Sequence, residues 1–302
     1  MLTGRFAPTP SGRLHLGNVL CAMLAWASVR SRGGRFLLRI EDVDVPRCPP
    51  GAGDRCISDL RWLGFDWDDP LIRQSERTSA YDAALARLTG AGMTYPCFCT
   101  RADLHPERAP NLGDTQVVYP GTCARLTPGE IAARRLLRSP AIRLRVPDET
   151  IRFTDRLQGP VSENLSRDCG DFVLKRSDGL FGYQLAVVVD DADSGVTEVV
   201  RGRDILSATP RQIWLQRLLG APTPSYAHIP LLTDPLGRRL AKRDADLDLA
   251  ALSKKYAPEA LLGILAMACG LRDSPAPAAL PELARDFSWD RIKREDIRLP
   301  QL

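Results

Sequence analysis

The chain has residues suited to nucleotide binding close to its N-terminus. Prolines and a glycine interrupt residues 8–12, and the sequence His15-Leu-Gly17-Asn18 follows. We predict a strand at residues 2–7, a loop, and a helix beginning near Gly17. The N–H groups of a helix N-terminus attract phosphate, His15 can donate to phosphate or ribose, and glycine leaves room for a flat ring. Taken alone, this short pattern favours an ordinary strand-to-helix turn.

A basic segment in the second half is the next candidate. Arg239-Leu-Ala241-Lys242-Arg243 follows an Asp-Pro-Leu-Gly turn. A lysine on such a loop can stabilise the charge that builds on an α-phosphate and on pyrophosphate during nucleotidyl transfer. The alternative is a solvated basic loop with no chemical role.

Four side chains between residues 97 and 123 could bind zinc. Cys97-x-Cys99 is followed by Tyr119-x-x-x-Cys123. Three thiolates and a phenolate can form a tetrahedral site, although zinc more often takes a fourth cysteine or histidine. His105 is therefore an alternative to Tyr119 as the fourth ligand. The remaining cysteines read as free thiols.

Hydrophobic periodicity predicts the elements that position these residues. Besides the N-terminal strand and helix, we predict strands at 35–40, 141–146, 151–155, 183–189, 197–201 and 228–232. We predict helices at 52–64, 76–91, 128–138, 209–219, 258–270 and 288–296. The β-branched run 183–189 reads as a buried central strand, and the strand–helix alternation indicates an α/β fold with a parallel sheet.

Composition shifts divide the chain into four segments. Residues 1–95 and 171–249 form the two halves of the α/β domain, 96–170 is a loop-rich insertion, and 250–302 is a small helical region. The 302 residues are 44% hydrophobic and carry a net charge of +4, which permits a polyanionic partner. With neither a long apolar run nor a signal peptide, the sequence predicts a cytoplasmic protein that does not bind membranes.

The two nucleotide motifs together resemble the HIGH and KMSKS signatures of class I aminoacyl-tRNA synthetases. The resemblance implies a Rossmann-type catalytic domain with an inserted zinc-containing α+β subdomain and a helical C-terminal region. It also implies that His15 and Lys242 are catalytic, and that His15, Gly17, Asn18 and Lys242 bind ATP as its magnesium complex. Ala241 departs from the family pattern, in which serine is more frequent.

Residues 5–15, from Arg5 to His15, and residues 37–44, which include Glu41, together resemble the glutamyl branch of this family. In that branch the residue equivalent to Arg5 meets the side-chain carboxylate of glutamate, and the residue equivalent to Glu41 meets its α-amino group. A guanidinium matches a carboxylate, and a carboxylate matches an ammonium. The resemblance implies a glutamate site made of Arg5, Ala7, Thr9, Glu41, Tyr183 and Arg201, with Tyr183 and Arg201 at the ends of two later strands.

The chain further resembles short paralogues of the glutamyl enzymes. Too little sequence follows Lys242 for the large helical anticodon-binding region. The paralogues have one structural zinc held like Cys97, Cys99, Tyr119 and Cys123, and they transfer glutamate to the wobble base queuosine of tRNA(Asp). We expect these substrates and a monomer. The alternatives are a truncated enzyme that charges the terminal ribose, a non-catalytic tRNA-binding relative and an unrelated nucleotidyltransferase.

Overall fold

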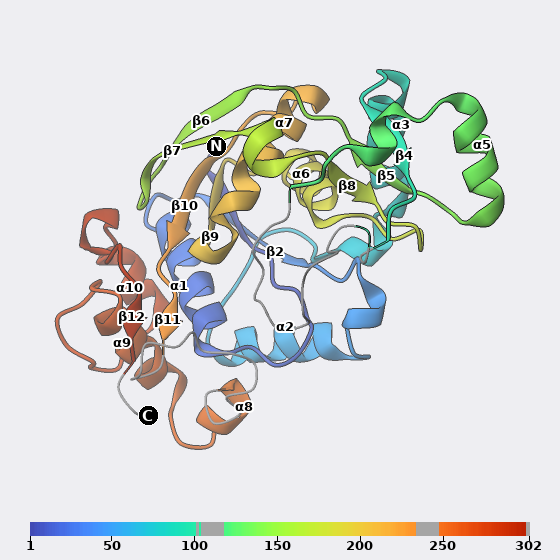
Figure 1. The fold of residues 1–302 in the computed structure, drawn as a ribbon. Helices are drawn as coiled ribbons and strands as arrows, with labels where there is room; N and C mark the ends of the chain where they lie inside the picture. The colour runs from blue at the N-terminus through green and yellow to red at the C-terminus, as the bar shows by residue number, and fades with distance from the viewer. Residues whose placement is uncertain (101–102, 104–117, 234–247, 300–302) are drawn as a thin grey trace.

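A parallel five-stranded sheet forms the centre of the computed structural model, which describes residues 1–100, 103, 118–233 and 248–299 (Figure 1). The strands stand in the order β10 (Ser225–Ile229), β9 (Glu198–Gly202), β1 (Thr3–Phe6), β2 (Arg35–Ile40) and β3 (Ile72–Arg73). The chain passes from β1 to β2 on one side and later places β9 on the other. Such a reversal opens a crevice at the carboxyl ends of the strands. The predicted α/β fold with a parallel sheet is confirmed.

Helices connect and cover these strands. Their bounds are α1 Leu16–Arg30, α2 Ala52–Trp62, α3 Thr78–Gly90, α5 Pro128–Leu137, α6 Tyr183–Asp193, α7 Thr209–Leu219, α8 Leu249–Leu252, α9 Pro258–Ala268 and α10 Leu280–Arg285. The helices predicted at 52–64, 76–91, 128–138, 209–219 and 258–270 are confirmed to within two residues at each end. None of the helices in the described part combines the length and apolar character needed to cross a membrane.

Alternate side chains of the sheet pack on opposite faces, as the pleat requires. Phe36 of β2 and Val200 of β9 join the large apolar cluster that contains α1 and the C-terminal helices. Leu37 and Val199, their neighbours in sequence, join Ile213 of α7 in a separate cluster. The helices α1 and α7 therefore cover opposite faces of the sheet.

The segment between α3 and α6 forms small antiparallel sheets. Strands β4 (Thr94–Cys97), β5 (Ala141–Leu144) and β8 (Phe172–Lys175) pair in that order. Strands β6 (Thr150–Asp155) and β7 (Gly159–Asn164) form a hairpin. The strands predicted at 141–146 and 151–155 are thus confirmed.

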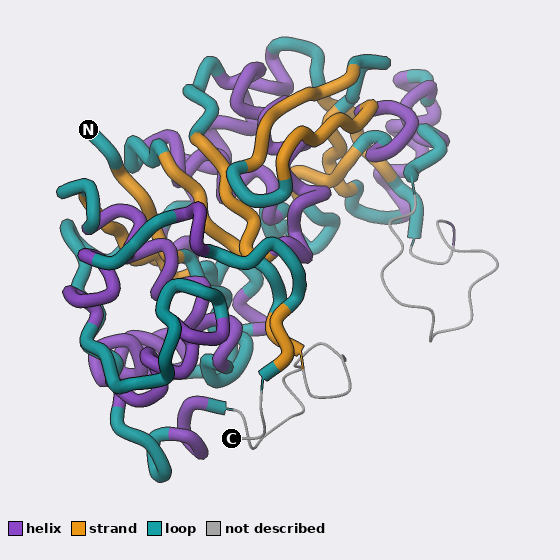
Figure 2. The backbone as a smooth tube through the Cα atoms, turned by 90° about the vertical axis from the view of Figure 1, so that its left-hand side faces the viewer, coloured by secondary structure: helices purple, strands orange, loops and turns teal. Residues whose placement is uncertain are grey.

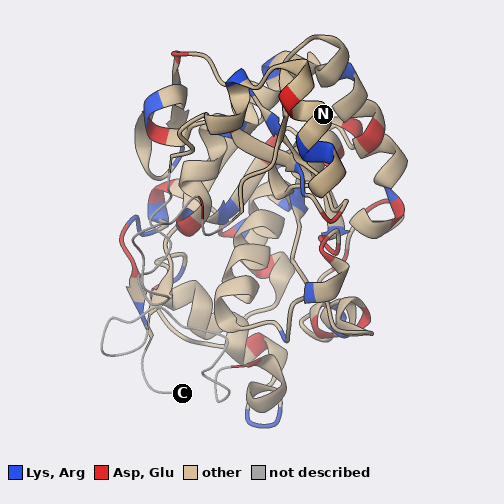
Figure 3. Cartoon of the chain, turned by 45° about the vertical axis from the view of Figure 1, so that its right-hand side comes forward, with Lys and Arg blue, Asp and Glu red and all other residues tan. Residues whose placement is uncertain are grey.

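The C-terminal part packs beside α1. Helix α10 contacts α1 and α9, and β12 (Ile297–Arg298) pairs in parallel with β11 (Leu232–Thr233). Helices α9 and α10 stand at the left edge of Figure 1 and face the viewer in Figure 2. Cations and carboxylates are interspersed over the described chain (Figure 3), in keeping with its small net charge.

The strand predicted at 183–189 is wrong, because this run forms helix α6. Residues 185–191 are all buried, and the helix packs against α3, α7 and β8. A helix buried on all sides is apolar on all sides, so its sequence lacks the 3.6-residue period that reveals an amphipathic helix. Gly182 precedes the helix, where a Cβ would lie 2.5 Å from the carbonyl oxygen of Val173.

The helix predicted at 288–296 is also wrong. Only a short 3-10 turn, Trp289–Arg291, occurs there, because the chain is drawn into tertiary hydrogen bonds. Lys293 N donates to the carbonyl of Cys269, and Ile297 N donates to that of Leu231. The strand predicted at 228–232 is divided into β10 and β11 around Pro230, which has no N–H for a continuous ladder.

A buried charge network joins the sheet to α6. Arg39 of β2 is 1% exposed, and its Nη1 donates to Asp191 Oδ1 at 2.6 Å while Nη2 donates to Glu41 Oε1 at 3.1 Å. Its Nε lies 3.7 Å from Asp190 Oδ2. Arg5 of β1 also donates from Nε to Asp191 Oδ1, at 3.3 Å. These contacts fix two strands and a helix relative to one another.

We expect Arg39→Met to lower the free energy of unfolding by about 3–5 kcal/mol, because buried carboxylates would lose their counter-charge. Urea denaturation measures this loss. Arg167→Met is the matched control, since Arg167 forms an exposed pair with its neighbour Asp168 and should cost much less. Equal losses in the two variants would contradict this account of the network.

Candidate functional site

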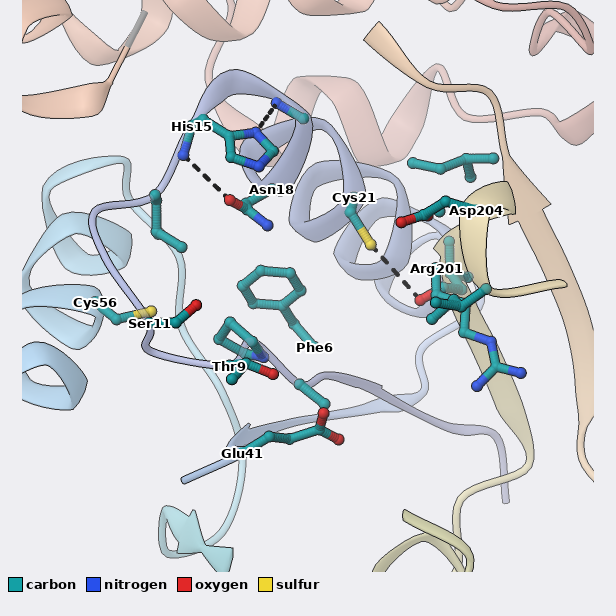
Figure 4. A pocket seen from close by; sticks show the side chains of 18 of the residues that line it. Phe6, Thr9, Ser11, His15, Asn18, Cys21, Glu41, Cys56, Arg201 and Asp204 are labelled. Carbon is teal, nitrogen blue, oxygen red and sulfur yellow. Dashed lines mark hydrogen bonds between the residues drawn. The ribbon is translucent and has the colours of Figure 1, made fainter. Parts of the chain in front are cut away.

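The residues predicted to bind glutamate and ATP, Lys242 apart, line one cavity of about 460 Å³ (Figure 4). These residues are Arg5, Ala7, Thr9, His15, Gly17, Asn18, Glu41, Tyr183 and Arg201. They come from the carboxyl ends of β1, β2 and β9 and from the first residues of α1 and α6. The cavity therefore occupies the crevice expected where the strand order reverses.

His15 forms the N-terminal cap of α1. Its Nδ1 accepts the N–H of Gly17 at 3.1 Å, and its own N–H donates to Asn18 Oδ1 at 3.1 Å. Because Nδ1 accepts, the proton of the neutral ring is on Nε2, where it can be donated to a phosphate. A Cβ at Gly17 would lie 2.9 Å from His15 Cε1, so any larger residue here would displace the capping ring. The first turn has no acidic residue to offset the helix dipole.

The predicted basic loop 239–243, including Lys242 and Ala241, lies outside the described residues. The described chain before the loop lines the cavity, and the described chain after it contacts residues that line the cavity. Leu232 lines the cavity before the loop. After it, Asp248 forms a β-bridge with His15, and Leu249 N donates to the carbonyl of Leu14 at 3.0 Å.

Arg5 and Glu41 place opposite charges in the lining of the cavity. Although burial acts to raise the pKa of Asp191, Arg39 and Arg5 hold it below its ordinary value, so Asp191 stays ionised and offsets part of the charge on Arg5. Burial outweighs Arg39 and raises the pKa of Glu41. An ammonium group bound at Glu41 would oppose that rise.

Arg201 lies near the end of β9, as predicted, and is 4% exposed. Its Nη2 donates to Thr209 Oγ1 at 2.7 Å and its Nε to His228 Nε2 at 3.0 Å. The remaining nitrogen, Nη1, is buried with no hydrogen-bond partner in the described part of the structure. A buried donor of this kind is costly unless a ligand satisfies it.

Tyr183 reaches the cavity differently from the prediction. It is the first residue of helix α6 and does not end a strand. Burial raises the pKa of its phenol. The hydroxyl therefore stays protonated at neutral pH and can donate to a ligand.

The predicted metal ligands gather in the antiparallel region, away from this cavity. The Sγ atoms of Cys97, Cys99 and Cys123 all lie within 4.8 Å of one another. The phenolic oxygen of Tyr119 is 3.4 Å from Cys97 Sγ and 3.5 Å from Cys99 Sγ. This spacing and donor set can hold one metal ion. The alternative ligand His105 lies outside the described residues.

The electrostatics of the cluster favour thiolate at one ligand. Burial acts to raise the pKa of Cys97, but hydrogen bonds with Tyr119 and Arg143 outweigh it and lower that pKa below its ordinary value. Arg143 Nε lies 3.2 Å from Cys97 Sγ, and its guanidinium stands 3.8 Å from the centre of the Tyr119 ring. The thiolate is the form that binds metal.

Sequence reasoning missed the residues that orient the cavity side chains. One feature of the sequence could have indicated Asp190 and Asp191: they are two adjacent carboxylates at the end of an apolar run. Asp155, Thr209 and His228 had none, because their roles depend on contacts between distant segments.

Comparison with known proteins identifies the family. The model of the catalytic domain of class I tRNA synthetases (E and Q) matches residues 1–271. The chain belongs to this family. A glutamyl-Q tRNA(Asp) synthetase from Symbiobacterium thermophilum is 50% identical, over 99% of this chain and 96% of that protein. One from Geobacter sulfurreducens is 49% identical, over 98% and 93%. The resemblance drawn from the motifs is confirmed.

Solved synthetases of the family share the fold. A glutamate tRNA ligase from Elizabethkingia meningosepticum, crystallised with its amino acid, superposes with a TM-score of 0.85 at 27% identity. The match covers 99% of this chain and 67% of that one. The glutamate-tRNA synthetase of Elizabethkingia anophelis gives the same TM-score at 28% identity, over 99% and 68%.

We expect two substitutions at His15 to test its capping role. His15→Ala removes the acceptor for Gly17 N–H and should lower the free energy of unfolding by about 1 kcal/mol. His15→Asn keeps a capping oxygen and should lower the free energy of unfolding by only a few tenths of a kcal/mol. Urea denaturation compares the two, and equal stability would show that the imidazole cap contributes nothing.

Proposed function

We propose that this chain activates L-glutamate with ATP and transfers the glutamyl group to queuosine at the wobble position of tRNA(Asp). The observation that carries the activation step is the gathering of nine predicted ligand-binding residues around one cavity at the switch point of the sheet. The acceptor is supported by the names of relatives about 50% identical over nearly the whole chain.

Glutamate would bind between the charged side chains that line the cavity. Arg5, Tyr183 and Arg201 offer donors to its side-chain carboxylate, and Glu41 offers a carboxylate to its ammonium group. Planar guanidinium groups match a carboxylate better than a carboxamide, since both oxygens of a carboxylate accept.

ATP, as its magnesium complex, would lie at the start of α1. The Nε2–H of His15 and the positive end of the α1 helix dipole would face its phosphates, with Asn18 fixing His15 through the cap. The α-carboxylate of glutamate attacks the α-phosphate, the bond to the bridging oxygen breaks, and pyrophosphate leaves. Lys242 stabilises the charge on that leaving group. Because no side chain acts as nucleophile, catalysis comes from positioning and electrostatics.

A ring hydroxyl of queuosine would then attack the mixed anhydride. The new ester bond forms at the glutamyl carbon, and AMP leaves with the electrons of the broken bond. The same activated intermediate would serve a terminal ribose, so the chemistry of activation does not distinguish the two acceptors. Only the acceptor RNA can do so.

One zinc ion would have a structural role. Cys97, Cys99, Tyr119 and Cys123 would hold it, closing all four positions of a tetrahedron. The ion would link β4 to the segment at Cys123. We propose that residues 96–170 form an insertion between the two catalytic halves, residues 1–95 and 171–249. Residues 250–302 form the fourth segment, the helical C-terminal region.

The acceptor can be tested with labelled glutamate and purified tRNAs. We expect label on tRNA(Asp) that contains queuosine and none on tRNA(Asp) without it. Removing the 3′-terminal adenosine should leave acceptance intact, because the modified base lies elsewhere in the tRNA. Charging of tRNA(Glu) with loss of acceptance after this removal would instead show an enzyme that esterifies the terminal ribose.

Metal content tests the proposed zinc site. Purified protein should contain one zinc per chain by elemental analysis, and Cys123→Ser should reduce this content and lower the melting temperature, since a thiolate ligand is lost. Cys48→Ser is the matched control, because Cys48 lies outside the cluster. The proposal would be contradicted if the wild-type protein contained no zinc and Cys123→Ser had the same melting temperature as the wild type.

A further inference from the structure

We propose that His228 is a positioning residue for Arg201. Its imidazole, with the hydroxyl of Thr209, holds the guanidinium through uncharged acceptors, so that the full positive charge remains for a substrate carboxylate. The chemical identity of that carboxylate, the side chain of glutamate, rests on the proposed function. The geometry around Arg201 is independent of the proposed function.

Arg201 is held on two sides and open on the third. Nε donates to His228 and Nη2 to Thr209, whereas Nη1 has no hydrogen-bond partner among the described residues. Within the described ranges, no carboxylate forms an ion pair with Arg201. A guanidinium that is 4% exposed and lacks a counter-charge is costly unless an anion binds it.

The contacts of His228 determine where its proton is. Nδ1 lies 2.6 Å from Asp155 Oδ2, and a carboxylate can only accept there. Nε2 lies 3.0 Å from Arg201 Nε, which can only donate, and 3.2 Å from Thr209 Oγ1. The ring is therefore neutral, with its proton on Nδ1. Burial lowers the pKa of His228 and outweighs the opposing hydrogen bond to Asp155, in agreement with this state.

Asp155 is itself rigidly placed at the end of β6. Its Oδ1 accepts the N–H groups of Leu157 and Gln158 at 3.0 and 2.9 Å, and both of its oxygens lie 3.1 Å from His228 N. The β6–β7 hairpin, which belongs to the insertion, thus fixes the ring that fixes Arg201. His228, Asp155 and Thr209 are all fully buried and do not line the cavity.

The contrast with Arg5 shows why neutral acceptors matter. Arg5 Nε donates to a carboxylate, Asp191, which offsets its charge. Arg201 has an imidazole nitrogen and a hydroxyl in the corresponding roles. Of the two arginines, Arg201 thus offers the stronger attraction to an anion and the stronger discrimination against an uncharged amide.

Two substitutions of His228 separate positioning from packing. In His228→Gln the side-chain oxygen can replace Nε2 as the acceptor for Arg201. In His228→Asn the shorter amide can still donate to Asp155 but does not reach Arg201. In glutamate-dependent ATP–pyrophosphate exchange, we expect His228→Asn to raise the KM for glutamate about tenfold or more, the range for losing a hydrogen bond to a charged group. His228→Gln should stay within about threefold, and neither should change the KM for ATP.

Equal KM values for glutamate in the two variants, or a parallel rise in the KM for ATP, would overturn the proposal. If neither variant unfolds cooperatively, Thr209→Val and Thr209→Ser replace them. The valine removes the acceptor and should raise the KM for glutamate, whereas the serine keeps it.

A spectroscopic readout is independent of activity. The chain has three histidines, so nitrogen-15 NMR of the imidazoles, assigned with His228→Gln, can locate each proton. We expect the proton of His228 on Nδ1, in contrast to His15. A proton on Nε2 would overturn the proposal even in an active enzyme. Absence of any glutamate-dependent exchange in the wild-type protein, with the Nδ1 proton present, would refute the proposed function and leave the positioning role standing.

Discussion

The ion pairs of Arg39 are the contacts on which the rest of the site depends. Two adjacent carboxylates of α6, Asp190 and Asp191, are buried against the sheet and require cations. Arg39 supplies one from β2, and the same guanidinium holds Glu41. Arg5 supplies another from β1, and Arg77 Nε pairs with Asp190 at 2.6 Å. Because α6 begins with Tyr183, satisfying these buried charges also places three of the side chains that line the cavity.

Charge is distributed unevenly within that cavity. Arg5 and Glu41 are partly neutralised by their buried partners, whereas Arg201 keeps its charge. The capped start of α1 adds the positive end of the helix dipole and the His15 ring, which favour phosphate. An amino acid with an acidic side chain and a nucleotide can thus bind side by side, with the α-carboxylate of the first directed to the α-phosphate of the second.

Local signals in the sequence were sufficient for some elements and not for others. The period of α1 and the flanking Pro/Gly loop correctly predicted the first strand, the loop and the start of the helix, because all three lie within one short stretch. The run 183–189 was wrongly predicted as a strand, because a helix buried on all sides and a buried strand have similar apolar compositions. The support of Arg201 was invisible for another reason: Asp155 and His228 are separated by 73 residues, and no local pattern records their pairing.

We infer that the cavity selects a carboxylate through uncompensated positive charge at Arg201. ATP–pyrophosphate exchange with L-glutamate and with L-glutamine tests this inference, because glutamine has an uncharged carboxamide where glutamate has a charged carboxylate. We predict kcat/KM for glutamate at least about 100-fold above that for glutamine, since a carboxamide would leave a buried guanidinium without its anion. Comparable values for the two amino acids would contradict the account.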